Sequence, residues 1–168
     1  MNKNLKLIQL NSEIYEDYLK TGIKLFMLKL GGYINLLIAF VHLIGLIWMV
    51  QVFKLFGISK QMNELSEIHS SFPYLLTIVV ALVFLVFGLY GLLADDKLPK
   101  MPFLKPVIFL IGGIYIFRGL GELIYETTRS KHSTTEIAYS FVALAIGLLY
   151  LIGGFKKWKV IRKKITNA

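Results

Sequence analysis

The sequence predicts an all-α integral membrane protein: a polytopic, up-and-down bundle of four transmembrane helices with an amphipathic interfacial helix at its N-terminus. Hydrophobic residues make up 56% of the chain, whereas a soluble domain is about 45–50% apolar. The excess lies in long runs of about 20 residues, the length that crosses a bilayer core about 30 Å thick. Basic residues cluster in alternate connections between these runs, as they do beside membrane spans. A chain of 168 residues suits a single domain.

Residues 1–31 are mixed in character and predict an amphipathic helix that lies in the cytoplasmic head-group region. Ser12 is a suitable N-cap, and Glu16 and Lys20 stand four residues apart in the favourable order. Apolar side chains recur at helical spacing on one side, namely Ile14, Tyr15, Tyr18, Leu19, Ile23, Phe26 and Leu30. A helix that docks a partner protein is the alternative interpretation.

Four apolar runs predict the membrane spans, at about residues 33–53, 74–94, 106–126 and 137–155. Pro73 and Pro106 open the second and third spans, where proline suits the first turn of a helix. The connection 95–105 is short, so the second and third spans should be antiparallel neighbours. Residues 156–168 form a basic tail.

The distribution of charge predicts the topology. Fourteen of the nineteen lysines and arginines lie in the N-terminal segment, the connection between the second and third spans, and the C-terminal tail. Four lie in the other two connections, and Arg118 lies within a span. This bias places both termini in the cytoplasm. The net charge of +9 then indicates contact with anionic lipid head groups and not with nucleic acid.

Arg118 is the residue least suited to lipid. It lies near the middle of the third span, where arginine costs about 2.5–3.5 kcal/mol on insertion scales. Glu122 follows four residues later, and Tyr115 and Tyr125 continue the pattern at three-residue spacing. The sequence therefore predicts a polar stripe that faces the bundle interior or a water-filled cavity.

His42 is the second polar residue near the middle of a span, at a depth similar to that of Arg118. Its imidazole could relay a proton or donate a neutral hydrogen bond. The candidate ligand-binding cluster comprises His42, Tyr115, Arg118, Glu122 and Tyr125. Two interpretations stay open: an Arg118–Glu122 pair that locks helix packing, or a cavity for a ligand head group or a proton.

Small residues line the other spans, where they let helices approach closely. Ala143 and Gly147 stand four residues apart, and Gly154 lies one heptad beyond Gly147. Gly112 and Gly113 fit the same role in the third span. Packing within the bundle is the first interpretation, and homo-oligomerisation is the alternative.

Several chemistries have no basis in the sequence. The chain has no cysteine, which excludes disulfides, thiolate metal sites and iron–sulfur clusters. It has no HExxH motif, phosphate loop or dinucleotide-binding glycine motif, and one histidine in a span does not suit a bis-histidine haem. We therefore expect no metal and no cofactor. Acid–base catalysis by His42 and Glu122 is the one enzymatic alternative.

In size and number of spans the chain resembles small four-helix membrane families such as DoxX-like and sterol-binding EXPERA-type proteins. It shares no motif with them, so the resemblance assigns no residue a role. The sequence favours a non-enzymatic accessory or interaction subunit of the bacterial cytoplasmic (inner) membrane, in contact with lipids and another membrane protein or a second copy. A binder or carrier of an apolar small molecule with a polar head is one alternative, and a proton-linked oligomeric transporter or channel is another.

Overall fold

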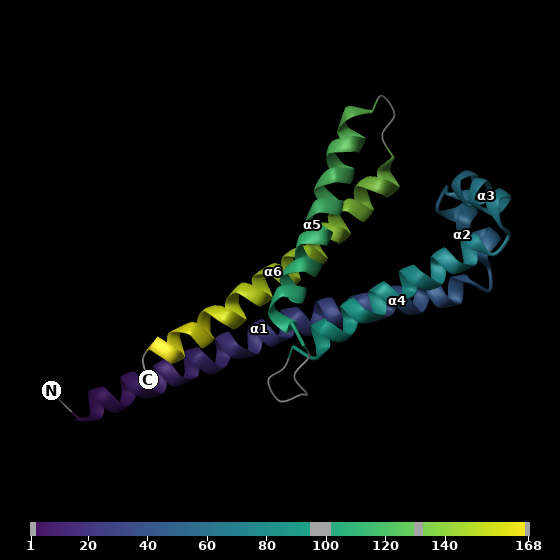
Figure 1. Cartoon of the computed structure of the whole chain (residues 1–168). Coiled ribbons are helices and arrows are strands. Elements are labelled where there is room, and N and C mark those ends of the chain that lie inside the picture. The colour runs from purple at the N-terminus through teal and green to yellow at the C-terminus, as the bar shows by residue number, and fades with distance from the viewer. Residues whose placement is uncertain (1–2, 95–101, 130–132, 167–168) are drawn as a thin grey trace. The chain divides into compact units, whose positions relative to one another are not determined.

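The computed structural model describes residues 3–94, 102–129 and 133–166, with side chains described from Gly22 to Lys159 in these ranges except for Lys24. The described residues form helices and their connections, with no strand, which confirms the all-α class (Figure 1). Six helices are described: α1 (Lys3–Gly45), α2 (Met49–Leu55), α3 (Ser59–Ile68), α4 (Phe72–Leu92), α5 (Leu104–Thr128) and α6 (Thr134–Thr166).

Four helices are long and apolar enough to cross a membrane, as predicted. The candidate spans are Leu25–Gly45, Phe72–Leu92, Leu104–Thr128 and Thr134–Lys159. These helices expose many large apolar side chains, among them Leu37, Leu82, Phe117 and Val142. Such exposure would be costly in water but suits contact with lipid chains. The chain is therefore an integral membrane protein.

The N-terminal segment is not a separate helix. Helix α1 runs without a break through Gly31 and Gly32, so the predicted boundary between an interfacial helix and the first span is absent. At 1.5 Å per residue, its 43 residues extend over about 64 Å, about twice the thickness of a bilayer core. The amphipathic pattern of residues 1–31 depends mostly on side chains outside the described ones.

The first candidate span also ends earlier than residue 53. Helix α1 stops at Gly45, and the next residues form a tight turn in which Ile47 N–H donates to the carbonyl of Ile44 (3.0 Å). Glycine weakens a helix at this point because it gains the most backbone freedom on leaving it. The remainder of the predicted span becomes α2, followed by the amphipathic surface helix α3.

The chain divides into two compact units, residues 32–89 and residues 1–31 with 90–168. In the first unit α1 and α4 run antiparallel, because Gly88 lies against Leu36 and His42 lies against Phe84 (ring centroids 5.3 Å apart). In the second unit the early part of α1 packs on α6. There a side chain at Gly31 would meet Tyr150, and one at Gly153 would meet Leu28.

Helices α5 and α6 form a close antiparallel hairpin through glycines (Figure 1). A Cβ atom added at Gly112 would lie 3.3 Å from the carbonyl oxygen of Gly147, and one at Gly147 would lie 3.1 Å from that of Gly112. A Cβ atom added at Gly119 would lie 2.9 Å from the carbonyl oxygen of Ser140. The two backbones therefore touch directly, which maximises van der Waals contact where lipid provides no hydrophobic drive.

This hairpin follows a seven-residue repeat. Gly112 and Gly119 stand seven apart on α5, as do Ser140, Gly147 and Gly154 on α6. A heptad spacing keeps one seam facing the partner helix in a left-handed pair. By contrast, Gly113 has open space around its Cβ position and lies outside this seam. The predicted packing role is thus seen for Gly112, Gly147 and Gly154.

Replacing Gly119 by alanine is expected to destabilise the hairpin. The added methyl would lie 2.7 Å from Leu144 Cγ and 2.9 Å from the backbone oxygen of Ser140, so the helices must move apart. Overpacking of this kind costs about 1–3 kcal/mol. Thermal unfolding in detergent should show a midpoint lower by several degrees for Gly119→Ala.

Gly121→Ala is the matched control, because it lies on the same helix and has open space at its Cβ position. Its unfolding midpoint should stay close to that of the original chain. Equal losses from both substitutions would contradict a glycine-specific seam.

Candidate functional site

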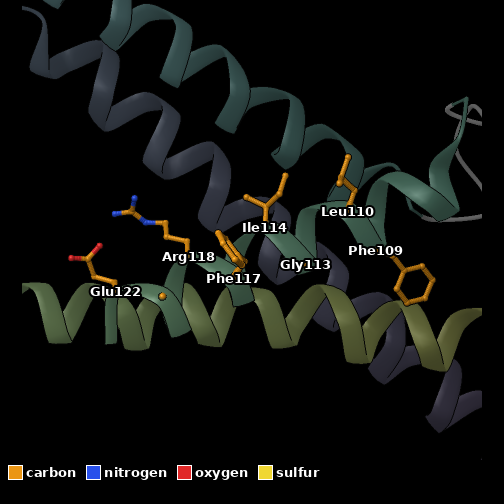
Figure 2. A pocket seen from close by; sticks show the side chains of 8 residues that line it. Phe109, Leu110, Gly113, Ile114, Phe117, Arg118 and Glu122 are labelled. Carbon is orange, nitrogen blue, oxygen red and sulfur yellow. The ribbon is translucent and has the colours of Figure 1, made fainter. Parts of the chain in front are cut away.

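One face of α5 carries two residues of the predicted site, Arg118 and Glu122. We call it the outward face. An open hollow of about 760 Å³ lies along it (Figure 2). Its lining belongs entirely to α5 and comprises Phe109, Leu110, Gly113, Ile114, Phe117, Arg118, Gly121 and Glu122. Apolar side chains fill one end of this face, with Phe117 82% exposed, and a basic and an acidic side chain occupy the other.

Arg118 and Glu122 project on the same side of α5 (Figure 2). Arg118 is exposed and Glu122 is half-buried. No ion pair joins them, and neither pairs with another residue in the described part of the chain. The expected local pairing is therefore not seen. An exposed arginine near the middle of a span retains its insertion cost of about 2.5–3.5 kcal/mol until another group offsets it.

The two tyrosines of the predicted stripe lie apart from Arg118. Tyr115 is 5% exposed and lies in the seam with α6. Tyr125 is exposed near the end of α5, where the Arg129 guanidinium lies 5.0 Å from its ring centroid. Three residues of an α-helix turn about 300°, so Tyr115 and Arg118 differ by about 60° in direction. This angle is enough to separate a seam position from an exposed flank.

His42 belongs to the other compact unit. Its Nδ1 lies 2.8 Å from the carbonyl oxygen of Ile38, one turn back on α1. Because a carbonyl only accepts, Nδ1 carries the proton. The imidazole ring rests against Phe84 of α4. These contacts are those of a histidine that satisfies itself within its helix and packs against a neighbouring ring, and the grouping of His42 with Arg118 stays a prediction.

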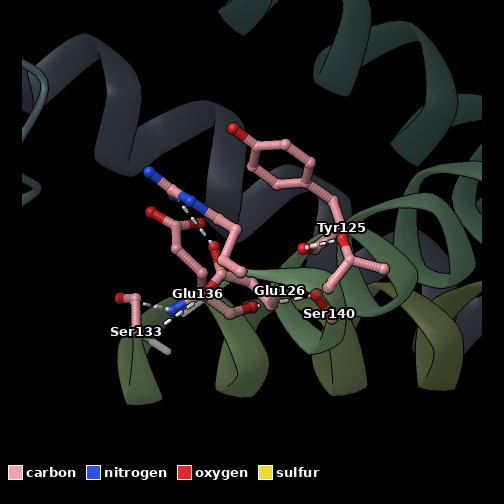
Figure 3. A network of polar contacts seen from close by, with 7 residues as sticks. Tyr125, Glu126, Ser133, Glu136 and Ser140 are labelled. Atoms are coloured by element: carbon pink, nitrogen blue, oxygen red, sulfur yellow. Dashed lines mark hydrogen bonds and ion pairs between the residues drawn. The ribbon is translucent and has the colours of Figure 1, made fainter. Parts of the chain in front are cut away.

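The most buried acid of the chain's described part is Glu126, which sequence reasoning did not single out. Its side chain is fully buried at the end of the α5–α6 hairpin (Figure 3). One carboxylate oxygen accepts a hydrogen bond from the Ser133 backbone N–H (2.8 Å). The other lies 3.3 Å from Nη1 of Arg129, which is about half exposed. Glu126 thus ties the end of α5 to the start of α6.

The Ser133 side chain caps the start of α6. The backbone N–H of Glu136 donates to the Ser133 hydroxyl (3.4 Å), which satisfies one of the free donors of the first turn. Glu136 also places negative charge beside the positive end of the helix dipole. The Ser-x-x-Glu spacing in the sequence could have predicted this start at residue 134 instead of 137.

Lys157, which falls in the predicted basic tail, is a second buried charge. Its side chain is 6% exposed, and its Nζ donates a hydrogen bond to the carbonyl of Ala94. Ala94 lies just beyond the end of α4, where a cation also suits the negative end of the helix dipole. Lys157 therefore ties α6 to the chain that follows α4.

Helical register could have identified both buried charges. Glu126 follows Gly119 by seven residues, and Lys157 follows Tyr150 by seven. Each charge therefore occupies the next position of a seven-residue repeat whose preceding residue is buried. In the sequence, Glu126 ends the predicted third span and Lys157 falls in the basic tail, two places where charges are ordinary.

Comparisons with known proteins assign the chain to no family: no family model matches it, and no curated protein or solved structure is significantly similar. Among the described residues, no three histidine, aspartate or glutamate side chains come together as a metal site would require. The outward face presents apolar side chains, one guanidinium and one carboxylate.

Glu126→Ala is expected to destabilise the protein, because the partly buried Ser133 N–H would lose its acceptor. Such an unsatisfied donor costs about 1–3 kcal/mol. Glu122→Ala removes the same charge one turn earlier, at a half-buried position without a described partner, and should change stability by less than about 0.5 kcal/mol. Thermal unfolding of the two variants in one detergent checks this order. A larger loss for Glu122→Ala would contradict it.

Proposed function

We propose that this protein is a non-enzymatic accessory subunit that binds a transmembrane helix of another membrane protein through the outward face of α5. One observation carries the proposal: Arg118 lies exposed near the middle of a spanning helix and has no ion-pair partner within the described chain. Its charge cannot be lost by deprotonation. A carboxylate supplied by a second protein at the same depth would offset the insertion cost.

The shape of the outward face also favours a helix as the occupant. Gly113 and Gly121 both have open space at their Cβ positions and flank the exposed ring of Phe117. Small residues let a second backbone approach closely. On the other side of α5, Gly112 and Gly119 receive α6 in this way. The outward face thus also carries glycines, eight residues apart instead of seven and on either side of a large exposed ring.

An amphipathic small molecule is the second candidate. The hollow has a volume within the range of about 300–1,000 Å³ found for ligand pockets. Its apolar lining ends in Arg118 and Glu122, which could meet a polar head. However, ligand pockets usually enclose most of their ligand, whereas this lining comes from one helix. The helix partner is therefore the stronger proposal.

Photo-cross-linking in the native membrane tests the proposal. A photoreactive residue at Phe117 should give a discrete protein adduct, and the attached peptide should be a transmembrane segment that contains aspartate or glutamate. Adding Arg118→Ala should lower its yield at least tenfold, since truncating one member of a buried charge pair costs about 2–5 kcal/mol.

The matched control places the same photoreactive residue at Val142, which is exposed on α6. This position should give lipid adducts and no discrete protein band. Lipid adducts alone from Phe117 would reject the protein partner. A stoichiometric small-molecule adduct that disappears with Arg118→Ala would favour the second candidate.

We also infer the topology and location from charge. The excess of basic residues beside alternate span ends supports an up-and-down arrangement of the four spans with both termini in the cytoplasm. Residues 3–24 of α1 precede its candidate span and continue the same helix, so they extend about 33 Å beyond the span on that side. The composition supports a bacterial cytoplasmic membrane.

Cysteine labelling checks this topology without background, because the chain has no cysteine. Ser70→Cys lies in the exposed connection between α3 and α4, and a membrane-impermeant maleimide should label it in intact cells. Lys156→Cys is exposed near the C-terminal end of the last candidate span and should react only after the membrane is permeabilised. The reverse pattern would place both termini outside the cell.

A further inference from the structure

An aromatic cluster joins α5 and α6 at the lysine-rich end of their hairpin. The ring of Phe109 on α5 lies 4.8 Å from that of Phe155 and 5.6 Å from that of Trp158, both on α6. We call these three residues the aromatic shelf. Phe155 is 63% exposed and Trp158 is half-buried, so the shelf is partly open to its surroundings. Tryptophan at a span end is typical of the head-group level of a membrane.

Two lysines lie beside the shelf, at the same end of the hairpin. Lys105 precedes Phe109 by four residues, and Lys159 follows Phe155 by four. Residues four apart share a face of an α-helix. Because α5 and α6 are antiparallel and Phe109 meets Phe155, both lysines lie on the same side of the shelf, on neighbouring helices. The register of the hairpin therefore places both cations at the same end of α5 and α6.

Neither lysine is neutralised within the part of the chain that the structure describes. Both are exposed, and neither forms an ion pair with a described residue. Lys157, between them and the bundle, is already bound to the carbonyl of Ala94. An anion can thus approach Lys105 and Lys159 from outside without displacing an internal contact.

We propose that Lys105, Lys159 and the aromatic shelf form a binding site for the head group of an anionic phospholipid. The two ammonium groups would hold the phosphate, and Trp158 would lie beside the glycerol region. Exposed Phe155 would contact the first part of the acyl chains. Basic sites between spanning helices at this level suit anionic head groups. This site shares Phe109 with the outward face but uses neither Arg118 nor Glu122, so it does not depend on the proposed protein partner.

The two tryptophans of the chain provide a direct test with an internal control. Trp48→Phe leaves Trp158 as the only tryptophan, and Trp158→Phe leaves Trp48 at the other end of the spans. Each protein is reconstituted in vesicles that contain brominated phosphatidylglycerol or brominated phosphatidylcholine, whose bromines quench nearby tryptophan. We expect stronger quenching of Trp158 by the anionic lipid and equal quenching of Trp48 by both.

Lysine variants locate the site. One lysine near an anionic surface changes lipid affinity by about fivefold. Lys105→Gln and Lys159→Gln should each lower the preference of the Trp158 reporter for phosphatidylglycerol by about that factor. Lys156→Gln, which removes an exposed charge at the same end but outside the pair, should lower it much less.

Two results would overturn the proposal. Equal quenching of Trp158 by the two lipids would show that no anionic lipid is preferred at the shelf. Equal effects of Lys156→Gln and Lys105→Gln would show a diffuse surface charge and no site. Both single-lysine positions are exposed, so the variants should remain folded, which the unfolding midpoint verifies.

Discussion

The contact of the α5 and α6 backbones at Gly112 and Gly147 sets the position of every functional candidate on this hairpin. A Cβ atom added to either glycine would lie only 3.1–3.3 Å from the carbonyl oxygen of the other. In lipid, this close approach supplies the packing energy that burial from water supplies in a soluble protein. The resulting register puts Glu126 beside Ser133, puts Lys105 and Lys159 on one side, and leaves Arg118 outside the seam.

The sequence was sufficient to predict the number and character of the spans, because about 20 consecutive apolar residues have few stable alternatives to a membrane helix. It was less informative about where helices begin and end. Residues 25–30 are apolar apart from Lys29, so α1 continues through the predicted boundary into its span. Gly45 ends that helix, although its neighbours are as apolar as the residues before it. Hydropathy does not register such local backbone preferences.

The candidate site was only partly predictable for a related reason. A spacing of three or four residues suggests a common face of the helix. Each such step still rotates the side-chain direction by tens of degrees, so Tyr115 is buried and Arg118 is exposed. A heptad count from the glycines would have placed Tyr115 in the seam and would have identified Glu126 as buried. The relation of His42 to this helix involves two units of the chain, so periodicity within one helix does not address it.

The shared register of the glycines and Glu126 has a consequence for how this chain can change over evolutionary time. A single residue inserted between Gly119 and Glu126 would rotate the carboxylate by about 100° and turn it from the seam toward lipid. The same insertion after Thr128 would alter only the connection. Insertions and deletions in related chains should therefore be absent between these two positions or occur in whole heptads, while the connection between α5 and α6 varies freely in length.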